Sequence, residues 1–391
     1  MVRCGGAAPF VHVLASLLPS RNPMPDLTCA VVHWNLPGLL ADCLASLLPE
    51  AERLRRRGLD VQVVVVDNDS RPDVRERLRA ETPEGVRVVW SEENLGYPRA
   101  CNLAYDATDA PLFLLSNPDV VYLPGSLEAL VRALDGAPEA ALAGPATWWD
   151  RERTLLMNPG YPEDRERLEA DAEARRTGTW PAHALAWERR MAELAVAPET
   201  REAEILSGAC MLVRRERIDA AGGLFDPALF LYYDDTDLCF RLRARGLPIL
   251  YVPDAEIVHL FNQSRRSDVA DRMAASRRHF LAKHYGPEEA EWLLRLAAEA
   301  VPAEDDFSAW RPRDLGVLSA PRPFTWEAPG PSLFALGLNP QVVPAAMARC
   351  ARPELRLGEA FWDQLTPGPY WARATDPASG RVLAYWKLVR P

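Results

Sequence analysis

The sequence predicts an α/β fold, in which helices flank a mostly parallel sheet and a small β-rich unit follows at the C-terminal end. Apolar runs rich in β-branched residues alternate with segments of helical spacing from residue 27 onward, which is the pattern of consecutive βα units. The run VQVVVVDN is continuously apolar, as expected for a strand covered on both faces. Near the C-terminus, WARAT and RVLAYWKLV flank an Asp-Pro-Ala-Ser-Gly turn, which predicts a hairpin.

Strands and helices follow one another regularly in the first part of the chain. Gly58 ends the first predicted helix, and Pro72 stands where the second begins. Such alternation favours parallel pairing through right-handed crossovers. We expect strands at residues 27–35, 61–70, 86–94 and 111–120, and helices at 37–57, from about 72 and at 96–108.

Beyond residue 120 the pattern is less regular. Residues 161–202 are highly charged and helix-favouring, which predicts a helical insertion. EILSGACMLVRR is a strand pattern, FDPALFLYYDDTDLCFRLRARG leads into a helix that ends at Gly246, and PILYVPDAEIVHL reads as a strand pair or a strand and turn. Helical spacing returns at 267–284 and 288–300.

These patterns divide the chain into four parts. A leader without fixed structure occupies 1–26, and its apolar stretch at 7–18 reads as a loose leader or a weak signal-like segment, with Met1 and Met24 both candidate starts. The main α/β domain follows at 27–300 and includes the insertion at 161–202. A Pro-rich linker at 301–331 leads to a β-rich domain at 332–391.

Composition excludes several classes of protein. With 391 residues and 48% apolar residues the chain can bury a large core, so a disordered protein is excluded. A net charge of −10 argues against nucleic acid as a partner. The seven cysteines form no CxxC pair, which favours reduced thiols and a cytoplasmic protein. No apolar run is long enough to span a bilayer, so we expect at most peripheral contact with the inner face of the membrane.

Polar side chains follow each of the four predicted parallel strands. In open α/β sheets, ligands bind beyond the carboxyl ends of the strands, so this edge is the candidate site. The residues there are His33, Asn35, Asp67, Asn94, Asn117 and Asp119.

Seven motifs in order carry a resemblance to a known family. They are VVHWN, VVVVDNDS, ENLGYPRACN, LLSNPDV, LSGACMLVRR, LYYDDTDLCFRLRARG and VHLFNQS. Together they resemble the family 2 inverting glycosyltransferases of the GT-A fold, a Rossmann-like α/β arrangement, and are most similar to the rhamnosyltransferase-like and galactofuranosyltransferase-like branch. The resemblance covers roughly residues 27–285 and implies sugar transfer from a nucleoside-diphosphate sugar.

Asp119 and His259 are the candidate metal ligands. The resemblance implies that a divalent cation, Mn²⁺ or Mg²⁺, binds here and neutralises the diphosphate leaving group. Relatives often carry Asp at both outer positions of the NPD triplet, whereas this chain has Asn117 at the first, so one anionic ligand is missing. Taken alone, Asp119 also reads as a strand-end cap and His259 as a core or surface histidine.

The donor-binding residues come from the first motifs. The resemblance implies that Asp67 accepts a hydrogen bond from a uracil or thymine ring, while its alternative role is to cap the next helix. Gly96 lets the backbone approach the donor, and Arg99 either reaches a phosphate or is a solvated helix charge. The implied nucleotide-sugar-binding residues are His33, Asn35, Asp67, Asn94, Gly96, Arg99, Asn102, Asn117 and Asp119.

Three acidic residues follow an aromatic run. Neighbouring carboxylates beside aromatic surface tend to hold a raised pKa, which suits a general base. The resemblance assigns the base to Asp235 and lets Asp234 bind the acceptor; the alternative is that both complement the positive end of the following helix. Gly208 permits close approach of an acceptor or merely tight packing, and Trp148 either stacks on a sugar or packs in the core.

Two functions are therefore compared. The first is an inverting glycosyltransferase that uses a dTDP- or UDP-linked sugar and a saccharide or lipid-linked saccharide acceptor in polysaccharide or O-antigen assembly. The alternative is a non-catalytic carbohydrate or nucleotide-sugar binding protein, with Trp371, Tyr385 and Trp386 as an aromatic platform. A homo-oligomer is compatible with the sequence and left open by it.

Overall fold

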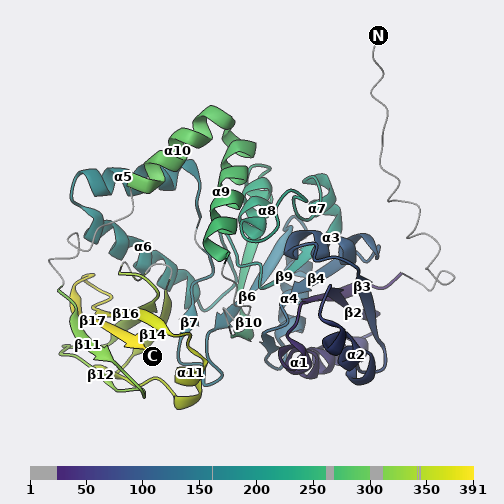
Figure 1. Ribbon diagram of the computed structural model, residues 1–391, viewed down its shortest axis with the longest axis horizontal. Coiled ribbons are helices and arrows are strands. Elements are labelled where there is room, and N and C mark those ends of the chain that lie inside the picture. Colours follow the sequence, from purple (N-terminus) through teal and green to yellow (C-terminus); the bar gives the residue numbers. More distant parts are fainter. Residues whose placement is uncertain (1–23, 161, 261–267, 300–310, 341, 343–344) are drawn as a thin grey trace, which may run out of the picture.

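A mixed sheet of 15 strands runs through the molecule in the computed structural model, which describes residues 24–160, 162–260, 268–299, 311–340, 342 and 345–391 (Figure 1). Residues 1–23 of the predicted leader lie outside the described residues. The long path of the sheet is β11-β17-β16-β13-β14-β7-β6-β9-β4-β1-β2-β3, with β10, β5 and β8 joined to it beside β6.

The first part of the chain forms the predicted βα units. β1, β2, β3 and β4 pair in parallel, and the register places His33 beside Asp67. Pro stands in the first turn of α1, α2 and α3, where its missing N–H costs no hydrogen bond. The elements are β1 (Leu27–His33), α1 (Pro37–Arg55), β2 (Val61–Asn68), α2 (Pro72–Glu81), β3 (Val86–Ser91), α3 (Tyr97–Asp106) and β4 (Leu112–Ser116).

The middle of the chain extends this sheet. β9 lies antiparallel between β4 and β6, and β10 is parallel to β6, so β6 and β10 run in the same direction as β1 to β4. β10 is one strand with an irregularity between Val252 and Glu256, rather than two separate strands. The elements are β5 (Val120–Tyr122), α4 (Ser126–Gly136), β6 (Leu142–Trp148), β7 (Leu156–Met157), β8 (Arg201–Glu202), β9 (Cys210–Arg214), α7 (Arg215–Ala220), α8 (Asp234–Arg243) and β10 (Ile249–His259).

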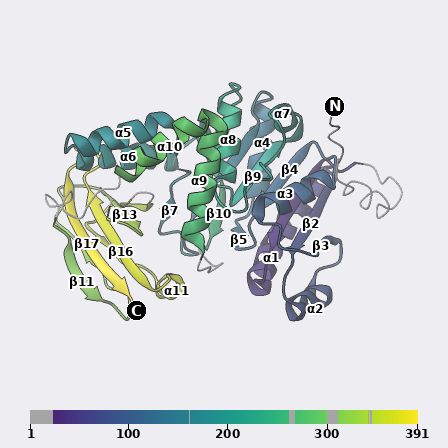
Figure 2. The ribbon, with the colours of Figure 1, turned by 45° about the horizontal axis from the view of Figure 1, so that its top comes forward.

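The range 161–202 contains two helices, α5 (Arg165–Arg176) and α6 (Trp180–Ala195). Two later helices, α9 (Val269–Tyr285) and α10 (Pro287–Glu299), pack on each other, and α10 also contacts α5 (Figure 2). Leu168 of α5 shares a buried cluster with Phe280 of α9 and Leu293 of α10. The four helices therefore form one layer. Among the described residues, no helix combines the length and the apolarity needed to cross a bilayer.

The C-terminal unit continues the sheet, because β14 pairs with β7. The prediction of a linker over 301–331 is wrong for the residues that the structure describes. β11 pairs with β17 and β12 pairs with β15, because their backbone N–H and C=O groups form hydrogen bonds with these strands of the C-terminal unit. Residues 301–310 lie outside the described residues. The elements are β11 (Arg313–Val317), β12 (Phe324–Thr325), β13 (Ser332–Gly337), β14 (Ala346–Cys350), β15 (Glu354–Leu355), α11 (Glu359–Gln364), β16 (Gly368–Thr375) and β17 (Val382–Arg390).

The predicted aromatic platform is wrong, because its three side chains are buried. Trp386 packs edge-on against Phe324 in the core of the C-terminal unit. Trp371 and Tyr385 belong to the large core cluster that also contains Met191 of α6. The rings stabilise the fold instead of offering a binding surface, so the non-catalytic alternative loses its main feature.

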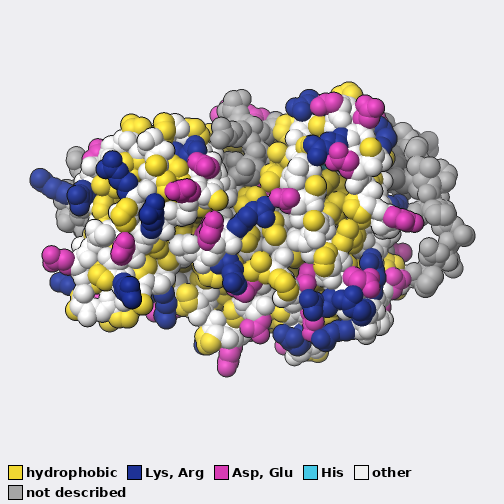
Figure 3. All heavy atoms as spheres, turned by 90° about the horizontal axis from the view of Figure 1, so that it is seen from below, with side chains coloured by type: hydrophobic (Ala, Val, Ile, Leu, Met, Phe, Trp, Pro, Cys, Tyr) yellow, Lys and Arg dark blue, Asp and Glu magenta, His cyan; other side chains and the backbone are white. Residues whose placement is uncertain are grey.

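Charged side chains of both signs mix with apolar ones on the face shown in Figure 3. Arginines at the ends of α1 and α2 have acidic neighbours: Arg57 lies 2.8 Å from Glu128, and Arg77 lies 2.7 Å from Glu81. This pairing reduces the attraction of these arginines for phosphates.

Candidate active site

The predicted site residues gather at one edge of the sheet. β1, β2, β4, β6 and β10 all end there because they run in the same direction, and β9 begins there because it runs the opposite way. The Asn117 amide after β4 donates to the carbonyl of Ala209 before β9 at 2.8 Å. This bond joins the segment that carries Asp119 to the segment that contacts Asp235.

Asp119 and His259 lie together at this edge. Asp119 Oδ1 is 3.3 Å from His259 Nε2, and the side-chain nitrogen of Asn117, Nδ2, is 3.5 Å from the same ring atom. Both partners are buried, and although burial raises the pKa of Asp119, the adjacent His259 lowers it below its usual value. The described residues contain no group of three His, Cys, Asp or Glu side chains that could hold a metal ion, and the metal-ligand role of Asp119 and His259 stays a prediction.

Asp234 and Asp235 begin α8 directly after two tyrosines in the left-handed region, Tyr232 at φ 68° and Tyr233 at φ 62°. This turn directs Asp235 toward the start of β9. Its Oδ2 accepts the Gly208 amide at 2.9 Å, and its Oδ1 accepts the Thr236 amide at 2.7 Å.

The two carboxylates share one environment but differ in hydrogen bonding. Burial and the charge of Asp235 raise the pKa of Asp234 to about 8. Burial also raises the pKa of Asp235, but donors from Gly208 and Thr236 favour its ionised form. Asp234 therefore holds its proton more strongly than Asp235 does, and the role of Asp235 as general base stays a prediction.

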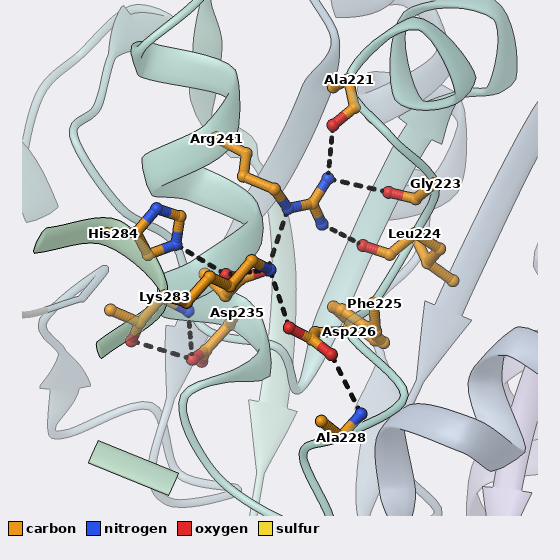
Figure 4. A network of polar contacts seen from close by, with 12 residues as sticks. Ala221, Gly223, Leu224, Phe225, Asp226, Ala228, Asp235, Arg241, Lys283 and His284 are labelled. Carbon is orange, nitrogen blue, oxygen red and sulfur yellow. Dashed lines mark hydrogen bonds and ion pairs between the residues drawn. The ribbon is translucent and has the colours of Figure 1, made fainter. Parts of the chain in front are cut away.

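Asp237, in the first turn of α8, anchors this helix. Its partners Arg241, Lys283 and His284 are labelled in Figure 4. Asp237 accepts hydrogen bonds from Arg241 at 2.9 Å, Lys283 at 2.7 Å and His284 at 2.8 Å. Burial raises the pKa of Asp237, but these three partners outweigh burial and hold the pKa well below its usual range. Lys283 also contacts Asp226 at 2.8 Å, so α8 and α9 are fixed to the loop before them. The network supports the position of Asp235 without touching it.

Asp67 and His33 are fully buried at the ends of β2 and β1. His33 Nε2 accepts the Leu36 amide at 3.0 Å, so in the neutral ring Nδ1 carries the proton and faces Asp67 Oδ1 at 3.3 Å. Asp67 also accepts from Arg75 at 2.8 Å and from the Ser70 amide at 3.3 Å. Burial raises the pKa of Asp67, but these hydrogen bonds outweigh burial and lower the pKa to about 2. The expected contact of Asp67 with a pyrimidine ring stays a prediction, because its oxygens already have protein partners.

Asn35 links these two strand ends. It adopts φ 57°, its amide donates to the Ser70 hydroxyl at 2.9 Å, and its side-chain oxygen accepts the Arg71 amide at 2.9 Å. Its place at the edge agrees with the sequence, but its contacts order the loop.

The segment from Asn94 to Asn102 is held by Asn68, whose role the sequence did not reveal. The Asn68 side chain donates to Asn94 at 3.2 Å and accepts the Leu95 amide at 2.9 Å. Asn102 donates to and accepts from the Phe225 backbone at 2.8 and 3.0 Å, so both ends of its amide serve the fold. Arg99 is half exposed, with Glu93 3.7 Å away.

Two further contacts shape the site and were not predictable from local sequence. The Tyr97 hydroxyl donates to the Gly208 carbonyl at 2.9 Å, and the Tyr97 amide donates to the Phe230 carbonyl at 2.9 Å. Gly208 is thus bound on one side by Tyr97 and on the other by Asp235. A Cβ at Gly208 would lie 3.3 Å from Asp235 Cβ, so a side chain there would press on Asp235.

Trp148 ends β6 level with Val258 of β10. It is partly buried, and its indole N–H donates to Glu256 at 2.8 Å. A contact with an acceptor sugar stays a prediction.

We expect Gly96→Ala to destabilise the protein by about 3 kcal/mol, because its backbone occupies a region open essentially to glycine alone. Its φ is 77° with ψ 167°, and an added Cβ would overlap the Phe230 carbonyl oxygen and lie 2.9 Å from that ring. Urea denaturation measures the loss. Gly85→Ala is the matched control, since Gly85 also has a positive φ but open space around it. Equal losses for the two variants would contradict the close packing at Phe230.

Comparisons with known proteins identify the family. The family described as "Glycosyltransferase like family 2" matches residues 25–286. An N-acetylglucosaminyl-diphospho-decaprenol L-rhamnosyltransferase of Mycobacterium tuberculosis is 32% identical over 296 residues, which are 70% of this chain and 90% of the relative. The O-antigen biosynthesis protein RfbC of Myxococcus xanthus is 27% identical over 253 residues, 62% of this chain and 18% of that protein. Among solved structures, mannosyltransferase PcManGT of Pyrobaculum calidifontis, in complex with GDP-Man and Mn²⁺, has a TM-score of 0.45 at 18% identity, covering 73% of this chain and 79% of that chain. The chain belongs to the glycosyltransferase like family 2, and it is an enzyme that transfers a sugar.

Proposed function

We propose that the protein transfers rhamnose or another hexose, with inversion, from a dTDP- or UDP-linked donor to a hydroxyl of a saccharide or lipid-linked saccharide. The mycobacterial relative, named for rhamnosyl transfer to a diphospho-lipid saccharide, supports this substrate class. The observation that carries the proposal is the placing of Asp235 and the Asp119–His259 pair at one sheet edge, joined through residues 208–209.

In the proposed reaction, the acceptor hydroxyl attacks the anomeric carbon on the face opposite the diphosphate. A new C–O bond forms to the acceptor oxygen while the C–O bond to the diphosphate breaks and its electron pair leaves with the phosphate oxygen. One carboxylate oxygen of Asp235, Oδ1 or Oδ2, takes the hydroxyl proton. Asp234 is neutral, so the two side chains carry one negative charge rather than two before the proton is transferred. Attack from the opposite face inverts the anomeric configuration.

A divalent cation fits the donor set at Asp119 and His259. When bound, the cation neutralises charge on the departing diphosphate. The carboxylate would bind either Mn²⁺ or Mg²⁺, but the imidazole favours Mn²⁺ over Mg²⁺, which prefers oxygen ligands. Two protein ligands would hold the cation weakly by themselves, so its binding would depend on the donor nucleotide, whose phosphate oxygens are suitable ligands.

We expect Mn²⁺ to support faster release of nucleoside diphosphate than Mg²⁺, and EDTA to abolish it. Asp119→Asn should lower the Mn²⁺-dependent rate by about a hundredfold, because a charge that stabilises the leaving group is lost. A panel of dTDP- and UDP-sugars, assayed with each cation, measures this and identifies the donor. Asp109→Asn, at an exposed loop carboxylate, is the control. Full activity in EDTA would contradict the cation; turnover with none of the donors would contradict the proposed substrate class.

A further inference from the structure

Gln364, at the end of α11, joins the C-terminal unit to the active-site edge. Its amide nitrogen donates to the carbonyl of Leu260 at 3.0 Å and to the carbonyl of Trp149 at 3.2 Å. These partners are 104 and 215 residues away in sequence. Both are carbonyl oxygens, so only the NH₂ group of the side chain can serve them, and both of its hydrogens are used.

Each of the two carbonyls belongs to the residue that follows a site residue. Leu260 comes directly after His259, and its own amide donates to the Asp119 carbonyl at 3.1 Å. Trp149 comes directly after Trp148 at the end of β6. One side-chain amide therefore connects the ends of β6 and β10. Leu260, its partner after β10, is in turn hydrogen-bonded through its backbone to Asp119.

Packing holds α11 in place for this contact. The Trp149 ring meets Phe361 of α11 edge-on, with centroids 5.2 Å apart, and both rings are buried. Phe361 and Trp362 belong to the core cluster of the C-terminal unit. The amide of Gln364 is consequently presented from a rigid element, which is what a precise positioning contact requires.

We propose that Gln364 is a positioning residue for the Asp119–His259 pair, and that the C-terminal unit is thereby part of the catalytic apparatus. This inference rests on the proposed function, in which that pair holds the cation. Gln364 touches neither substrate nor metal; it fixes the peptide that carries His259. Its loss removes one hydrogen bond from each of the two backbone carbonyls and allows the end of β10 to shift.

The test compares Gln364→Leu and Gln364→Met, which remove the donors, with Gln364→Lys, which keeps donors at the end of an unbranched chain. Asp363→Asn, at the exposed neighbouring residue, is the control. Mn²⁺ binding to the full chain with dTDP present is followed by the loss of free-Mn²⁺ electron paramagnetic resonance, and Mn²⁺ activation and melting temperature are measured in parallel. Loss of the two hydrogen bonds should weaken Mn²⁺ binding roughly tenfold in the Leu and Met variants. We expect kcat at saturating Mn²⁺ to change little and Lys to restore most of the affinity.

Two results would overturn the inference. One is wild-type Mn²⁺ affinity in folded Gln364→Leu or Gln364→Met. The other is a loss of binding that follows the loss of folded protein in every variant, Lys included, which would make the role merely structural. Failure of the proposed function looks different: wild-type protein would then show neither donor turnover nor dTDP-dependent Mn²⁺ binding.

Discussion

Asp235→Asn should lower kcat for sugar transfer by about a thousandfold, because the acceptor hydroxyl loses the group that takes its proton. The amide keeps the shape of the side chain but has one oxygen, so it can accept the hydrogen bond from Gly208 or the one from Thr236, but not both. Release of nucleoside diphosphate, measured alongside donor binding, checks this. Donor affinity near the wild-type value with kcat lost is the expected pattern.

The pH dependence of the reaction separates the two carboxylates. Asp235 works only when ionised and its pKa is raised, so the rate rises with pH as Asp235 loses its proton. Asp234 is neutral when Asp235 ionises, so Asp234→Asn exchanges one uncharged side chain for another and should leave the rising limb near its wild-type position. This variant should retain far more activity than Asp235→Asn. If Asp234→Asn were the more damaging change, Asp234 would be the base and the assignment would be wrong.

Arg373→Met should destabilise the protein by about 3–5 kcal/mol, because it leaves the Glu188 carboxylate buried without its partner. Arg373 of β16 pairs with Glu188 of α6, and their side chains are 0% and 2% exposed. Thr375 adds a hydrogen bond to Glu188 at 3.5 Å. The pair joins the C-terminal unit to the helical insertion, so both parts should unfold more easily.

Chemical denaturation of the single and double variants tests this pair. Glu188→Leu combined with Arg373→Met should recover much of the lost stability, since an apolar pair leaves no buried charge. Arg176→Met is the matched control, because Arg176 makes an exposed ion pair with Glu173 and should change stability by less than about 1 kcal/mol. If Arg373→Met changed the free energy of unfolding as little as Arg176→Met does, this would contradict the importance of the buried pair.

The parts of the fold that local pattern determines were predictable. The continuous apolar run of β2 and the strand-end polar residues identified the parallel sheet and its active edge, because alternation and strand direction follow from nearby residues. The Asp-Pro-Ala-Ser-Gly turn likewise predicted the hairpin of β16 and β17, which pair antiparallel. The match of the chain to its family confirms the resemblance to family 2 glycosyltransferases.

The parts that depend on tertiary contacts were not predictable. Asn102 looked like a donor-binding residue, but its partner Phe225 is 123 residues away. β11 lies in a Pro-rich stretch, and only its pairing with β17 makes it a strand. Tyr97, Asn68 and Gln364 gave no signal, because each acts on a backbone group that distant sequence brings into reach. Sequence reveals which residues can do chemistry more readily than which ones hold them in place.

The central claim is that a cation-held diphosphate and a proton-accepting aspartate share the edge where β1, β4, β9 and β10 meet. Crystals of the full chain soaked with Mn²⁺ and dTDP, measured at the manganese absorption edge, test it most directly. We predict an anomalous peak bonded to Asp119 and His259, with the diphosphate beside it and Asp235 at the same edge of the sheet. A manganese peak that contacts neither of those two side chains would contradict the account.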